Sequence, residues 1–412
     1  MVSISRDFAP PFKLIAPYFV IGVLFYLISS LFMFSLDISE MMSYFEFKIV
    51  GLVHLYLLGF VMMIIFGAMA QLIPVVLERG HFSVDFYYII YPILSVGTLL
   101  MAFGFLYSNI VLSFGGIFVL IAMSIFAFET LLTIKGIEKF NTTIVSVLIS
   151  NIFLWIGVIV GFIMALTFAG MITSNVVLLL KAHIYLVVGG YIFITIIAFS
   201  YVLLPMFGLA HGFSKRPLDF SIMSQSIGVV CVFFSSLIES NLIAKIGYLL
   251  SLISIFSYFY LVYLINKKRA RKQNDMYIIS LLISFVSFVL AVIFGVLYVA
   301  SFEEKFAILS GWFLFVGFFG FMIFGHLYKI VPFLVWYEKF SPFVGKKKVP
   351  MLADMVPNRS ANLQIFFTSC GLFVESIAIF YKIEFLHTLG VICLCVGAFI
   401  MFYNLMFMIN YN

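Results

Sequence analysis

Five ionisable side chains lie well inside long apolar runs of this 412-residue chain. They are His54, His183, His326, Lys329 and Glu375. An ionisable group within a membrane-spanning segment is expensive and is by default a functional-site hypothesis. Neutral imidazole is a good ligand for iron and copper, and a planar macrocycle between two helices can take one axial histidine from each. These residue types therefore predict a haem or metal site, a buried charge pair, or part of a proton path.

His54 and His183 are the haem-ligand pair that the sequence favours. Each lies about six to eight residues inside its predicted helix, which is about 10 Å below the outer boundary at 1.5 Å per residue. Lys181 is placed to neutralise a haem propionate. Three glycines are expected to leave room for the macrocycle plane: Gly59, Gly189 and Gly190. The alternative is that each histidine only forms a hydrogen bond to a neighbouring helix.

The other polar residues give a second set of candidates. Lys329 lies one turn after His326, and Glu375 lies near the middle of the next predicted helix. A Lys329–Glu375 ion pair is the structural interpretation, and a proton path that also includes Gln71 is the functional one. His326 and His211 are further candidate metal ligands.

Three more ionisable residues are expected to have no special role. Glu129 lies near the cytoplasmic end of a predicted helix, where a long side chain extends to the interface. His81 and His387 fall at loop or helix-end positions, and we expect both to be solvated.

The elements that must position these residues are membrane-spanning helices. The chain is 65% hydrophobic and 10% charged, whereas a soluble domain has about 45–50% and about 25%. About 20 apolar residues cross the hydrocarbon core as a helix. We expect an all-α polytopic membrane protein, a single domain over 1–412 with a polar connector at about 338–361. The predicted helices are about 12–35, 48–77, 84–107, 109–133, 142–169, 175–209, 217–239, 243–266, 276–300, 306–336, 362–382 and 385–409.

The orientation follows from the positions of lysine and arginine. They gather at the N-terminus, which contains Arg6, and in loops that follow even-numbered helices, including 267–272 and 346–348. Cytoplasmic loops carry this excess, so both termini are expected to be cytoplasmic, in a bacterial cytoplasmic membrane. The net charge of +6 results from this excess of basic residues in the cytoplasmic loops. We expect a lipid bilayer as the partner, and the charge does not indicate binding to nucleic acid.

An internal repeat appears when the second and tenth helices are aligned at an offset of 258 residues. This alignment places His54, Gly59, Gly67 and Pro74 on Trp312, Gly317, Gly325 and Pro332. The sixth helix carries a looser copy, with His183, Gly189, Gly190 and Pro205. We expect three four-helix units around a pseudo-threefold axis, at about 12–133, 142–266 and 276–409. The alternative is chance recurrence of glycine and proline, which are common in membrane helices.

The run HLYLLGFVMMIIFGAMAQLIPVV, which begins at His54, resembles the second helix of haem-copper oxidase subunit I. The resemblance implies twelve helices in three arcs and places His54 as an axial ligand of a low-spin haem, here taken as haem b. That family carries two adjacent copper-binding histidines on its seventh helix, whereas DFSIMSQSIGVVCVFFSSLIES has none. Its tenth helix has two histidines near the outer end, where this chain has Trp312. Oxidase turnover is therefore not expected, and copper has little support.

The segments AHIYLVVGGYIF and LAHGFSKRPL resemble a helix of the NnrS family, twelve-helix haem- and copper-associated membrane proteins linked to nitric oxide stress. This resemblance puts His183 and His211 at matching places. Both resemblances imply a haem-binding membrane protein in redox, nitric oxide response or metal-cofactor handling, with a respiratory redox partner or a membrane oligomer. The alternatives are a secondary transporter or channel that uses Lys329 and Glu375, and a non-catalytic assembly subunit.

Overall fold

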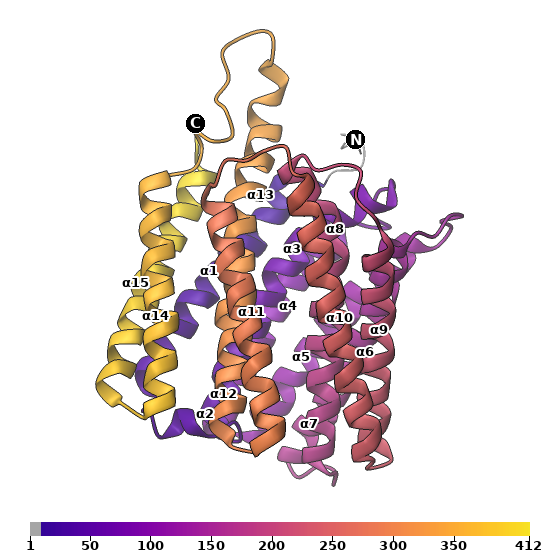
Figure 1. Ribbon diagram of the computed structural model, residues 1–412, viewed down its shortest axis with the longest axis vertical. Coiled ribbons are helices and arrows are strands. Elements are labelled where there is room, and N and C mark those ends of the chain that lie inside the picture. Colours follow the sequence, from indigo (N-terminus) through magenta and orange to yellow (C-terminus); the bar gives the residue numbers. More distant parts are fainter. Residues whose placement is uncertain (1–9) are drawn as a thin grey trace. The chain divides into compact units, whose positions relative to one another are not determined.

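The computed structural model describes residues 10–412, and this range is helical without strands (Figure 1). Within it, twelve segments are long and apolar enough to cross a membrane. They correspond one to one with the predicted helices, with ends that differ by a few residues. The predicted all-α polytopic fold is confirmed. Arg6 lies outside the described residues.

Most of the spans are single α-helices, and three are longer composites that contain a π-helix. In chain order the elements are α1 (Phe12–Phe32), η1 (Met33–Ser35), η2 (Glu40–Met42), α2 (Phe47–His54), η3 (Leu55–Met62), α3 (Met63–Leu77), α4 (Asp85–Tyr107), α5 (Asn109–Ile134), α6 (Thr142–Phe168), α7 (Val176–Ile184), η4 (Tyr185–Phe193), α8 (Ile194–Gly208), α9 (Arg216–Leu237), α10 (Asn241–Lys268), α11 (Met276–Ser301), α12 (Glu304–Trp312), η5 (Phe313–Gly320), α13 (Phe321–Lys339), η6 (Ser341–Phe343), α14 (Asn358–Tyr381) and α15 (Glu384–Ile409).

Several of these helices begin at a polar residue that caps the first turn. The side chains of Asn141, Ser240 and Asp275 accept hydrogen bonds from backbone N–H groups at the starts of α6, α10 and α11. Such caps satisfy donors that have no partner within the helix. They fix the helix ends at the edges of the apolar runs.

The three composite spans each contain a π-helical segment at a similar place. The segment η3 begins directly after His54, η4 begins two residues after His183, and η5 begins directly after Trp312. The bounds of η3 and η5 differ by the same 258 residues as the sequence alignment. π-Helical turns are rare in proteins, and those that occur are often found at functional sites. The coincidence supports the proposed repeat, whose threefold arrangement stays a prediction.

The described chain forms two compact units. One contains 71–97 and 109–273, and in it α9 packs along α10 while α6 packs against α5 and η4. The other contains 10–70, 98–108 and 274–412, and in it α14 packs along α15 while α1 packs against α15 and η3.

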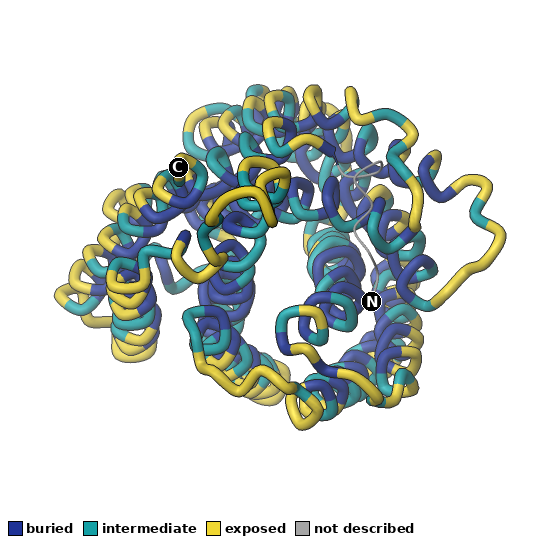
Figure 2. The backbone as a smooth tube through the Cα atoms, turned by 90° about the horizontal axis from the view of Figure 1, so that it is seen from above, coloured by how far each residue is buried: buried dark blue, intermediate teal, exposed yellow. Residues whose placement is uncertain are grey.

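Single helices show one buried and one exposed side (Figure 2). On α15 the buried residues recur every three or four positions, as in His387, Val391, Leu394 and Ala398. The opposite side of the same helix exposes large apolar side chains such as Phe399. An apolar exposed side is what a helix needs where it faces lipid tails.

Small residues allow the closest helix contacts. In the unit that contains α9 and α10, a Cβ added at Gly228 would lie 2.9 Å from the carbonyl oxygen of Gly247. Helices in membranes associate largely through such close packing of small residues. The α9–α10 pair therefore depends on glycine at this position.

Replacement of Gly228 by alanine should destabilise the protein by about 1–3 kcal/mol, the usual range for overpacking. The measurement is thermal unfolding in detergent. Gly311→Ala is the matched control, because a Cβ there meets its nearest atom at 3.7 Å and should leave the unfolding temperature unchanged. Equal unfolding temperatures for both variants would contradict the packing account.

Candidate functional site

His54, His183 and His326 share one hydrogen-bond pattern. Nδ1 lies 2.8 Å from the Val50 carbonyl oxygen in His54, 2.8 Å from that of Gly157 in His183, and 2.7 Å from that of Met322 in His326. A carbonyl oxygen only accepts, so Nδ1 must carry the proton. In the neutral ring Nε2 is then the nitrogen with the lone pair. Metal-ligating histidines usually donate their other N–H in this way.

His54 is the last residue of α2 and is half-buried. Its ring lies against Phe105 of α4, with centroids 5.1 Å apart. The hydrogen bond from Nδ1 reaches the carbonyl oxygen of Val50, one turn earlier on α2, and so holds the ring against its own helix. This fixes the direction in which Nε2 points.

The predicted role of Gly59 in leaving room for a macrocycle does not match the packing. A Cβ at Gly59 would lie 2.4 Å from the ring of Phe25. The glycine instead lets α1 approach η3.

His183 on α7 lies against two glycines of α6. Its Nδ1 donates to Gly157, and a Cβ added at Gly161 would lie 2.6 Å from Cε1 of the imidazole. Gly157 and Gly161 are therefore site residues that the sequence reasoning missed. Their four-residue spacing places them on one helix face, and this small-residue pattern was the available signal. Lys181 is half-buried, two residues before His183.

Gly189 and Gly190 contact other side chains of the same unit. Gln225 Nε2 donates to the Gly189 carbonyl oxygen at 3.1 Å. A Cβ at Gly190 would lie 2.8 Å from Cβ of Phe153. Both glycines thus serve helix packing, as Gly59 does.

The predicted Lys329–Glu375 ion pair is wrong, because each residue has a different partner. Lys329 Nζ lies 2.5 Å from Asp275 Oδ2, and 5.8 Å from the centre of the Tyr277 ring. Asp275 also caps α11. The lysine therefore reaches the N-terminal end of α11 rather than α14.

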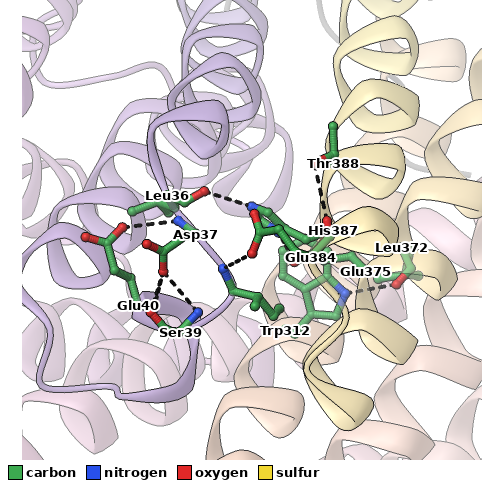
Figure 3. Close-up of polar contacts among 11 residues, drawn as sticks. Leu36, Asp37, Ser39, Glu40, Trp312, Leu372, Glu375, Glu384, His387 and Thr388 are labelled. Atoms are coloured by element: carbon green, nitrogen blue, oxygen red, sulfur yellow. Dashed lines mark hydrogen bonds and ion pairs between the residues drawn. The ribbon is translucent and has the colours of Figure 1, made fainter.

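Glu375 is fully buried and pairs with His387 (Figure 3). His387 Nδ1 lies 2.8 Å from Glu375 Oε1, and Nε2 lies 3.1 Å from the Leu36 carbonyl oxygen. The expectation that His387 is solvated is wrong, since this residue is 2% exposed. The chain reverses after α14, so the first turn of α15 packs over Glu375. A glycine at position 390 provides space, because a Cβ there would lie 2.9 Å from Glu375 Oε2.

A second buried histidine–glutamate contact lies in the other unit. His81 Nδ1 is 3.1 Å from Glu129 Oε1, and both side chains are fully buried. Tyr87 and Thr133 donate their hydroxyl groups to the same carboxylate, at 3.2 and 2.7 Å. The predictions that Glu129 extends to the interface and that His81 is solvated are therefore wrong. The loop that carries His81 folds back onto α5.

The remaining candidates lie apart from these contacts. Gln71 is buried on α3, and its Oε1 has no hydrogen-bond partner within the part of the chain that the structure describes. His211 is exposed in the turn after α8. Among residues 10–412, no group of three or more His, Cys, Asp or Glu side chains is arranged to hold a metal ion.

No protein-family model matches the chain, and no curated protein matches it.

Replacement of Asp275 by asparagine should destabilise the protein by about 1–3 kcal/mol, because Lys329 then keeps a partly buried charge without its carboxylate. Asparagine is also a good N-cap, so the start of α11 should persist. Chemical or thermal unfolding in detergent gives the measurement. The double variant Asp275→Asn/Lys329→Met should recover most of the loss. A single variant as stable as wild type would show that the ion pair contributes nothing.

Proposed function

We propose that this protein is a haem-binding membrane protein in which His54 and His183 provide Nε2 ligands to haem b. The observation that supports the proposal is the hydrogen bond from each Nδ1 to a backbone carbonyl oxygen, at 2.8 Å in both residues. This bond sets the tautomer that coordinates iron through Nε2 and holds the ring in one orientation. The proposed role is redox, nitric oxide response or metal-cofactor handling.

The donor chemistry of the two histidines suits haem, but the glycines do not make the space. Phe25 and Phe153 fill the positions beside Gly59 and Gly190. We therefore assign ligation to the imidazoles alone and helix packing to the glycines. Haem, when bound, supplies one-electron chemistry or gas binding at its iron.

The chain's own residues act on the two imidazoles. Val50 and Gly157 hold the Nδ1 protons, and Phe105 and Gly161 fix the planes of the rings. The copper-binding histidines of oxidases are missing from the seventh helix, so oxygen reduction is not part of the proposal.

The transporter or channel alternative uses the buried residues Lys329 and Glu375. Each has its own partner, Asp275 for Lys329 and His387 for Glu375. The two residues therefore do not form one buried ion pair. The assembly-subunit alternative differs in its prediction that no haem is bound.

The haem proposal predicts a Soret band in protein purified from haem-replete cells, with haem b found by pyridine haemochrome. His54→Ala and His183→Ala should each lower haem affinity by about tenfold or more, since even outer-shell changes at such sites have effects of 10–100-fold. His211→Ala is the control, because this exposed histidine should not affect haem content. Wild-type protein purified without haem would contradict the proposal.

We also propose that both termini and the connector between α13 and α14 are cytoplasmic, as the basic residues at 346–348 indicate. Alkaline phosphatase fused after Lys347 should be inactive, whereas the same enzyme fused after Lys382 should be active. The opposite pattern would reverse the orientation.

A further inference from the structure

The contacts of His387 determine how many protons it shares with Glu375. Nε2 faces the Leu36 carbonyl oxygen at 3.1 Å, so Nε2 must carry a proton. Nδ1 faces Glu375 Oε1 at 2.8 Å, and a hydrogen bond there needs one more proton on either atom. The pair thus holds two protons, one more than a neutral imidazole and a carboxylate hold together.

Burial explains why the pair keeps this extra proton. Whether the proton lies on nitrogen or on oxygen, the net charge of the pair is zero. Loss of the proton would leave a net negative charge on a pair that is 0% and 2% exposed. An unpaired buried charge is strongly unfavourable. Glu375 Oε2 is also buried, and no hydrogen-bond partner is present for it in the described part of the chain.

We propose that Glu375 and His387 form a proton-binding site, and that its bound proton attaches the segment 36–42 to α14 and α15. The segment follows α1 and contains η2. Two hydrogen bonds join the segment to α15. His387 Nε2 donates to the Leu36 carbonyl oxygen at 3.1 Å (Figure 3). The Ile38 N–H donates to Glu384 Oε2 at 2.9 Å. When the proton leaves to solvent, one proton remains on the imidazole. His387 then cannot donate both to Glu375 and to Leu36.

Charged side chains also lie on the elements around the Glu375–His387 pair. Glu384 lies one turn before His387 on α15, and Lys382 ends the turn between α14 and α15. On the attached segment, Asp37 accepts from the Ser39 hydroxyl, which holds the pKa of Asp37 below its usual value. Glu40 pairs with Lys48. Glu375 and His387 are the buried members of this set. The proposed proton site does not depend on the haem proposal.

The test compares hydrogen exchange of the segment in wild type and Glu375→Gln, in lipid nanodiscs, from about pH 6 to above pH 9. The glutamine amide donates to Nδ1, so His387 keeps its Nε2 proton for Leu36 at every pH. At low pH the two proteins should exchange equally. At high pH wild type should exchange about tenfold faster than the variant, the effect of one lost buried hydrogen bond. Equal exchange over the whole range would overturn the proposal.

Glu384→Gln is the matched control. It weakens the Ile38 contact but keeps both partners of the shared proton, so exchange should be faster than in wild type at low pH and should still rise at high pH. A second measurement records the ¹⁵N resonances of labelled histidine in wild type. The His387 resonances are assigned by their absence from His387→Gln. At neutral pH we expect His387 Nε2 to be protonated and Nδ1 to be hydrogen-bonded to Glu375. An unprotonated Nε2 there would also overturn the proposal.

Discussion

The structure depends on the absence of water from the hydrocarbon core, because every backbone polar group there must find its partner within the protein. The helices satisfy the backbone in this way, and several side chains donate to backbone carbonyl oxygens. Ser221 donates to the Ser254 carbonyl oxygen, and His54 and His183 donate to Val50 and Gly157. For a histidine the consequence is chemical, since a carbonyl partner at Nδ1 assigns the lone pair to Nε2. The membrane environment thus favours the tautomer with the lone pair on Nε2.

The spans were predictable because the length of an apolar run is set by the thickness of the bilayer, and each observed span corresponds to a predicted one. Partners were not predictable in this way. His81 and His387 stand in short connections, and nothing in those segments indicates that Glu129 and Glu375 lie beneath them. Lys329 was assigned to the wrong carboxylate because spacing along one helix does not say which neighbouring helix its side chain reaches. The sequence repeat marked where the π-helical segments lie, but not that these segments are π-helical.

The glycines show why a residue type alone is weak evidence for a site. Gly59 and Gly190 were expected to make space, and each is closed by a phenylalanine. Gly161 received no role from the sequence, yet it is the residue on which the His183 ring lies. Both histidines precede a π-helical segment, and so does Trp312 in the third composite span. An imidazole therefore stands before the first two of these segments and an indole before the third.

The central claim is that Nε2 of His54 and of His183 is a metal ligand. The most direct measurement is an experimental density map, at side-chain resolution, of protein purified from haem-replete cells. We expect haem density with iron about 2 Å from Nε2 of each histidine, the usual metal–imidazole distance. The claim would be contradicted by a map in which both Nε2 atoms contact only protein atoms.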